Sequence, residues 1–194
     1  MRRAAVVIPM IASLLASTAG AQAIGAALGG WSTTGARPAD DPARGLRLSG
    51  IYDRPWHATA RWRVEGAFVQ AGFTRDFPTR PNRHVTENSL EFGAHLMSRP
   101  IGTTQIRAFA GPVVAVGIGC GTDGENDSNG RISCSDFGLG NSGELRLGAA
   151  LGAHSELGES RRLTLDFRAQ FNTIGAARGR GPALSVAIGL RVPR

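Results

Sequence analysis

The sequence predicts an all-β protein in which eight antiparallel strands close into a single up-and-down β-barrel. The first observation is alternation: apolar and polar residues exchange places with a period of two along most of the chain, as the side chains of a strand do. The second is spacing, because short polar turns and longer polar loops separate the alternating runs in turn. The third is size, since 194 residues suit one domain with room for one closed sheet.

The clearest unit is a hairpin within residues 142–173. In its first run Leu145 lies on the apolar face and Arg146 on the polar face, and the second run repeats the pattern with Leu165 and Asp166. Each run has about 12 residues, just over the roughly 9–11 residues that a tilted strand needs to cross a bilayer. The hairpin is therefore long enough to span a membrane.

The same pattern predicts six further strands. In chain order they occupy residues 24–33, 45–52, 57–77, 85–97, 104–119 and 182–192. Short turns are expected at residues 53–56, 99–102 and 156–160, and longer loops at residues 35–44, 78–84 and 175–181 and between the two cysteines. This order puts the short turns and both ends of the chain at one end of the barrel, and the long loops at the other end.

The N-terminus predicts a cleaved signal peptide over residues 1–23, followed by a barrel domain over residues 24–194. Arg2 and Arg3 precede an apolar run, and small residues of the A-x-A type follow that run. A transmembrane helix is the alternative, but the run is well short of the roughly 20 residues that a spanning helix needs. All 22 basic residues are arginine, and no dense arginine cluster contains interleaved aromatic residues, so we expect no nucleic-acid partner.

The two faces of the strands differ in charge. The apolar face is nearly free of charged residues in the middle of every clear strand, whereas the polar face mixes both signs with glycine. A membrane barrel turns its apolar face outward, and eight strands leave an interior that side chains fill. We therefore expect a lumen of paired charges in which glycines make room for arginines. The predicted lumen charges are Arg61, Arg63, Glu65, Glu91, Arg107, Glu144, Arg146, Asp166, Arg168 and Arg191.

Cys120 and Cys134 flank a polar loop and are expected to form a disulfide, as is usual outside the cytoplasm. Two free buried thiols are the alternative. Residues 123–130 alternate oxygen-bearing side chains loosely like a calcium loop, but the sixth-position glycine and a clear twelfth-position glutamate are missing. A solvated acidic loop is the favoured interpretation, and calcium binding stays open.

With this patterning, the signal sequence and the terminal strand at residues 183–192, the chain resembles the small eight-stranded outer-membrane β-barrels, the OmpA/OmpX-like porin superfold of Gram-negative bacteria. The resemblance covers roughly residues 24–192. It implies a place in the outer membrane, contact with its lipid and lipopolysaccharide, and insertion by the barrel-assembly machinery. The chain departs from the family in ending its last strand on Leu190 and Val192 rather than an aromatic residue. Its aromatic girdle is sparse, with Trp31, Tyr52, Trp56 and Trp62 as the main candidates.

The sequence predicts no enzyme. His154 and Ser155 are adjacent, so a strand directs them to opposite faces, and they cannot form a nucleophile–base contact. His95 also falls on the polar face and is expected to belong to the polar plug of the lumen. We expect a monomer without cofactor or metal, with a structural or surface-interaction role. The alternative is a soluble periplasmic β-barrel that carries an apolar ligand inside.

Overall fold

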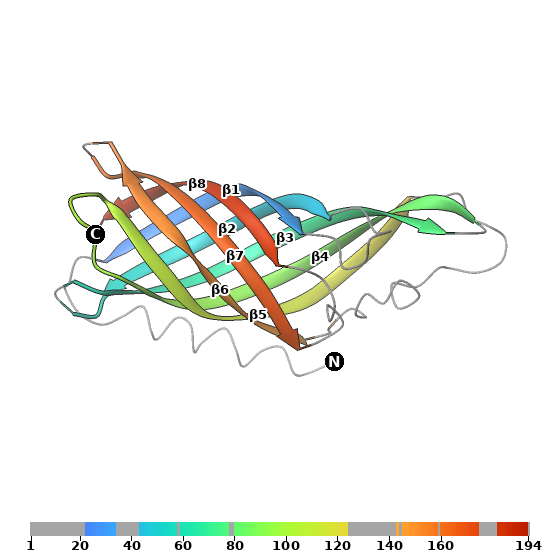
Figure 1. The fold of residues 1–194 in the computed structure, drawn as a ribbon, viewed down its shortest axis with the longest axis horizontal. Coiled ribbons are helices and arrows are strands. Elements are labelled where there is room, and N and C mark those ends of the chain that lie inside the picture. Colours follow the sequence, from blue (N-terminus) through green and yellow to red (C-terminus); the bar gives the residue numbers. More distant parts are fainter. Residues whose placement is uncertain are drawn as a thin grey trace.

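The computed structural model describes residues 22–33, 43–57, 59–77, 80–123, 143, 145–158, 160–174 and 182–193. In this part of the chain eight strands form one closed antiparallel barrel in the order of the sequence (Figure 1). The strands are β1 (Ala23–Thr33), β2 (Arg44–Pro55), β3 (Arg61–Phe77), β4 (Arg80–Met97), β5 (Ile106–Asp123), β6 (Leu145–Leu157), β7 (Leu163–Ile174) and β8 (Ala183–Pro193). The predicted fold class is confirmed.

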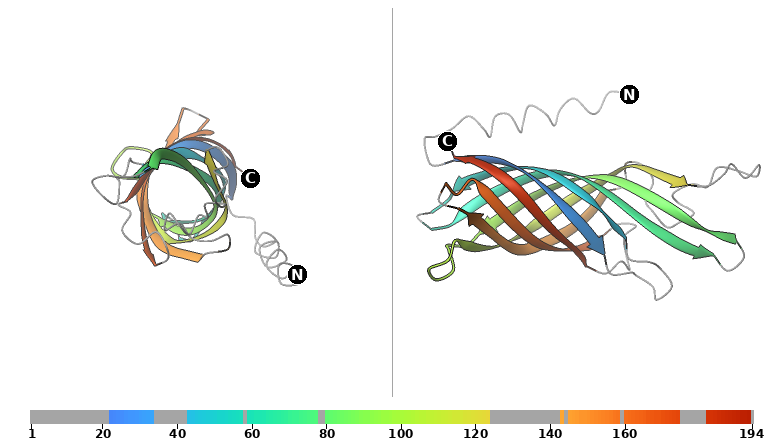
Figure 2. Two further views of the ribbon diagram at one scale, coloured as in Figure 1. Left: turned by 90° about the vertical axis from the view of Figure 1, so that its right-hand side faces the viewer. Right: turned by 90° about the horizontal axis from the view of Figure 1, so that it is seen from above.

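The barrel closes where the first and last strands meet. Strand β1 pairs with β8 along its whole length, from Ala23 opposite Pro193 to Thr33 opposite Ala183. The end-on view in Figure 2 shows the resulting ring. Closure gives every strand two neighbours, so the sheet has no unpaired edge. No helix among the described residues is long and apolar enough to cross a membrane.

The strands differ in length. Strands β3, β4 and β5 have 17, 18 and 18 residues, whereas the other five have between 11 and 13. The three long strands extend past the rest of the barrel at one end (Figures 1 and 2). This extension corrects the predicted loop at residues 78–84, because residues 80–84 belong to β4 and pair with β3, with Thr74 opposite His84. Backbone hydrogen bonds between strands do not depend on the side chains. The polar residues 80–84 lack the apolar alternation from which the other strands were predicted, so this part of β4 was missed.

The connections β2–β3, β4–β5 and β6–β7 lie at the opposite end, together with the start of β1 and the end of β8. We call this end the short-turn end, and the other the long-loop end. Two predicted turns are wrong in detail. Asp53 was expected in a turn but lies in β2, and Glu156 was expected in a turn but lies in β6. The turns themselves fall two to four residues later, and Trp56 N–H donates to the carbonyl of Ala60 at 3.0 Å.

Exposed apolar side chains cover the outside of the barrel. They occupy alternate positions of all eight strands, and the most exposed are on β8, where Ile188 is 60% and Leu190 66% exposed. The residues between them point inward and are buried, as Ala187 is. An apolar exterior around a polar interior is the distribution of a barrel that spans a lipid bilayer.

Three of the predicted features concern residues outside the described part of the chain. The signal peptide lies there apart from its last two residues, and so do Cys134 and most of the acidic loop at residues 123–130. Cys120 is described near the end of β5 and is not a free thiol. The disulfide, the signal peptide and the calcium question therefore stay predictions.

The cost of placing a charge on the outer face should depend on its depth in the bilayer. Ile188 lies in the middle of β8, opposite Leu28 of β1 and Leu165 of β7, and its side chain faces outward. Ile188→Arg should lower the free energy of unfolding by about 2–4 kcal/mol, because it places a charge at the bilayer midplane. Leu157→Arg, at the short-turn end of β6, should cost about 0–1 kcal/mol. Urea unfolding in lipid vesicles measures both, and equal costs would contradict the outward assignment of this face.

Candidate functional site

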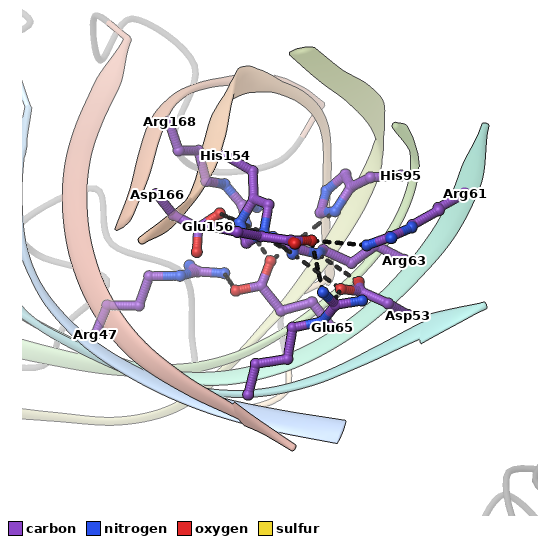
Figure 3. A network of polar contacts seen from close by, with 11 residues as sticks. Arg47, Asp53, Arg61, Arg63, Glu65, His95, His154, Glu156, Asp166 and Arg168 are labelled. Carbon is purple, nitrogen blue, oxygen red and sulfur yellow. Dashed lines mark hydrogen bonds and ion pairs between the residues drawn. The ribbon is translucent and has the colours of Figure 1, made fainter. Parts of the chain in front are cut away.

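The interior of the barrel is the main concentration of charged side chains in the described residues. Every strand from β2 to β8 sends at least one charged side chain inward, because charged residues fall on the face opposite the lipid-facing residues. The buried ionisable residues are Arg47, Asp53, Arg63, Glu65, Glu87, Glu91, His95, Arg107, His154, Glu156, Asp166 and Arg168. Figure 3 shows how most of them converge from different strands.

A closed ring of five side chains crosses the lumen in its long-loop half. Arg47 of β2 pairs with Glu65 of β3 at 3.1 Å and with Glu91 of β4. Glu65 also accepts a hydrogen bond from Arg168 of β7 at 2.7 Å. Arg168 donates to the side-chain oxygen of Gln170 at 2.8 Å, and the amide of Gln170 donates to Glu91 at 2.9 Å, which completes the ring. Four strands are thus joined through their side chains across the interior.

A second group surrounds Arg63 nearer to the short-turn end. Arg63 binds Asp53 through two nitrogens, at 2.8 and 3.3 Å, and donates to Asp166 across the lumen at 2.8 Å. The same oxygen of Asp166 lies 2.9 Å from Nδ1 of His154. A guanidinium that two carboxylates hold in this way is fixed in one orientation. The His154–Asp166 pair is therefore part of a structural cluster, with Arg63 against both members.

Glu156 connects this cluster to the short-turn end. One of its oxygens accepts hydrogen bonds from Arg61 at 2.7 Å and from Arg191 at 2.5 Å. The Nε of Arg191 also lies 3.5 Å from Asp53. The interior cluster and the rim of the barrel are thus one continuous network.

Two more arginines lie near the ends of the lumen. Arg107 donates to the backbone carbonyls of Thr59 and Ser98, at 3.1 and 2.9 Å, and so ties two of the short turns together. Arg146 pairs with Glu87 at 2.8 Å, toward the long-loop end. The lumen is therefore occupied by polar contacts along its length.

The structure places nine of the ten predicted lumen charges inside the barrel with a bonding partner. They are Arg61, Arg63, Glu65, Glu91, Arg107, Arg146, Asp166, Arg168 and Arg191. Glu144 lies outside the described residues. Four interior charges were missed: Arg47, Asp53, Glu87 and Glu156. Arg47 alternates with Leu46 and Leu48, so its pattern was sufficient to find it, whereas Asp53 and Glu156 were assigned to turns.

The inward face of β5 corrects the expectation that the lumen face is polar. Apart from Arg107 it carries Phe109, Val113 and Ala115, all buried. Phe109 packs against the ring of His95, with the ring centroids 5.3 Å apart. One side of the lumen is therefore filled by apolar side chains.

Two interior glycines, Gly93 and Gly152, lie against ring side chains and not against arginines. A Cβ on Gly93 would lie 2.6 Å from Cε1 of His95, and a Cβ on Gly152 would lie 2.6 Å from Cζ of Phe109. Both distances are far below van der Waals contact. The two glycines thus leave space for the rings of His95 and Phe109, and a Cβ on Gly152 would also lie 2.0 Å from the backbone oxygen of Phe167.

Two small cavities lie in the interior. A cavity of about 20 Å³ lies among Arg47, Glu65, Phe109 and Arg168, and another of about 10 Å³ lies beside Arg63 and His154. These volumes hold about one water molecule each. Neither of these two cavities has room for a substrate.

Both ring nitrogens of the fully buried His95 lack a hydrogen-bond partner among the described residues. No group of three metal-ligating side chains is found among the described residues either.

No family model matches the chain, and no curated protein sequence matches it. Solved structures do match. Ail, the attachment invasion locus protein of Yersinia pestis, in complex with the heparin analogue sucrose octasulfate, is 13% identical with a TM-score of 0.52, over 90% of this chain and 100% of that one. Neisserial surface protein A is 12% identical with a TM-score of 0.52, over 92% of this chain and 100% of that one. The chain has the fold of the small eight-stranded outer-membrane β-barrels.

The resemblance read from the sequence is confirmed at the level of the fold. Identities of 12–13% carry no residue roles from those proteins to this chain. In an eight-stranded barrel the lumen is packed with side chains rather than open, and the network around Arg63 and Glu65 fills part of it in this chain.

Glu65 generates the second test, because it holds two arginines. Glu65→Ala should lower the free energy of unfolding by about 3–5 kcal/mol, since it leaves Arg47 and Arg168 buried with one partner fewer each. Arg44→Gln, at an exposed position, should change it by less than about 0.5 kcal/mol. Unfolding in lipid vesicles measures both. A cost below about 1 kcal/mol for Glu65→Ala would mean that the pairing contributes little.

Proposed function

We propose that the chain is an integral outer-membrane protein with a structural or surface-interaction role at its long-loop end, and that it is neither a catalyst nor an open pore. The observation that carries the proposal is the inverted distribution of side chains. Residues such as Leu28 and Ile188 are exposed on the outside, while charged residues such as Arg63 and Glu65 are buried and paired inside. Such an exterior is stable in hydrocarbon and unfavourable in water.

The soluble ligand-carrying barrel is the less well supported alternative. An apolar ligand would need an apolar interior cavity of a few hundred Å³. The cavities found measure about 20 and 10 Å³ and are lined largely by charged side chains such as Arg47 and Arg63. Water around this barrel would also face an apolar surface on all eight strands.

A role at the cell surface has two lines of support. Strands β3, β4 and β5 extend past the other strands at the long-loop end, so part of the sheet projects beyond the barrel wall (Figure 1). The two similar structures are of an attachment invasion locus protein and of a surface protein. In this proposal the long-loop end faces outward among lipopolysaccharide, the barrel-assembly machinery inserts a monomer, and export depends on the signal peptide.

The lumen generates a prediction on conductance. Purified protein in planar bilayers should show no large, stable conductance, because the ring through Glu65 and the cluster at Arg63 cross the interior. Arg47→Ala combined with Arg168→Ala removes two of the crossing side chains and should raise the frequency of openings. Large, steady currents from the unsubstituted protein would contradict a closed lumen.

Fractionation of cells that express the full chain tests the proposal itself. The protein should stay in the outer-membrane fraction through washes with high salt and alkaline carbonate, and should leave it only with detergent. It should also migrate faster on gels before boiling than after, as a folded barrel does. Release by osmotic shock without detergent would instead favour the soluble barrel.

A further inference from the structure

The short-turn end carries the net charge of the barrel. Residues 24–194 contain 20 arginines and 15 acidic residues, a net charge of +5. The described residues of the short-turn end, 53–57, 59–62, 98–107, 156–158, 160–162 and 191–193, contain seven of these arginines and two acidic residues. The other 13 arginines of residues 24–194 are matched in number by 13 acidic residues. The whole excess of positive charge therefore lies at one end.

The lumen network does not neutralise this end. Arg61 and Arg191 share the carboxylate of Glu156, and Arg191 also lies 3.5 Å from Asp53. Arg107 donates to the backbone carbonyls of two turns. Arg99, Arg161 and Arg162 lie in the turns, are exposed, and form no ion pair with a described residue. Their charges face the medium around the barrel.

Aromatic side chains mark the same end on the outside of the barrel. Trp56 and Trp62 are 56% and 40% exposed, with their ring centroids 5.6 Å apart. Arg54 lies opposite Trp62 in the sheet, and Tyr52, two residues before Arg54 in β2, lies opposite Val64. Tryptophan and tyrosine gather at the level of lipid headgroups in membrane proteins. The arginines of the turns therefore lie at or just beyond the headgroups of one leaflet.

We infer that the short-turn end binds the phosphate groups of anionic phospholipids in the leaflet that it touches. The inference rests on the proposed function, which puts this end on the periplasmic side, where the leaflet consists of phospholipid. Guanidinium groups bind phosphate through paired hydrogen bonds. The negative potential of an anionic lipid surface also attracts basic residues that lie close to it. The arginines are distributed over all three turns and β8, so they surround the barrel rather than form one pocket.

Lipid titration of the detergent-solubilised full chain tests the inference. Native mass spectrometry would give the apparent affinity for phosphatidylglycerol and for phosphatidylcholine of the same chain length. The protein should prefer phosphatidylglycerol, and the preference should fall as the salt rises from about 0.05 to about 0.5 M. Arg99→Gln should reduce the preference about fivefold, and further loss should follow when Arg161→Gln and Arg162→Gln are added.

Arg44→Gln is the matched control, because Arg44 is an exposed arginine at the long-loop end of β2. It should leave the preference unchanged. The three turn arginines hold no interior group, so all variants should keep the β-sheet circular dichroism and the gel mobility of the folded barrel. Equal affinity for the two lipids, or an equal loss in Arg44→Gln, would overturn the inference.

Two further outcomes separate the inference from the proposed function. A barrel that inserts into phosphatidylcholine vesicles but shows no preference for phosphatidylglycerol would overturn the inference alone. A chain that fails to insert into either lipid would overturn the proposed function as well. If the triple variant loses binding to purified peptidoglycan sacculi while its lipid preference is unchanged, the partner of this end is the cell wall and the inference is wrong.

Discussion

Ion pairs across the lumen between β3 and β7 are the interaction on which the rest of the barrel depends. These strands lie four places apart in a ring of eight, so their inward side chains face each other. Arg63 reaches Asp166 at 2.8 Å, and Arg168 reaches Glu65 at 2.7 Å. Moving one charge out of water costs several kcal/mol, and eight strands leave no water column to solvate it. The charges are therefore tolerated inside only where they are paired, and that requirement favours the observed inward face of β2 to β8.

Sharing of carboxylates makes such a network possible in a narrow interior. Glu65 serves Arg47 and Arg168, and Glu156 serves Arg61 and Arg191, so fewer acidic side chains hold more arginines in place. The inward face of β5 carries a single arginine. Its other large side chain, Phe109, is apolar and fills volume beside the charged network. Charged and apolar packing thus divide the lumen between them. Each limits the space that water has beside the other.

The faces of the strands could be predicted from the sequence, while the partners and the strand ends could not. Alternation is a local property, so Leu165 and Asp166 were assigned to opposite faces correctly. Which acid meets Arg63 depends on the register of strands that lie about 100 residues apart, and no local pattern contains it. Asp53 was missed because it precedes Pro55 and Trp56 in a stretch typical of turns. Backbone pairing with β3 nevertheless continues β2 through Asp53 as far as Pro55.

Alternation also has no direction, so it cannot distinguish one end of a barrel from the other. In this protein two independent features do. The long strands β3 to β5 extend past the wall at one end, and the unbalanced arginines with Trp56 and Trp62 lie at the other. Lengthened strands place backbone beyond the bilayer, where it contacts solvent or a partner, whereas short turns keep their side chains at headgroup depth. The two ends therefore differ in structure, which fits the proposed place in a membrane with two unlike leaflets, while ion pairs between β3 and β7 cross the lumen between them.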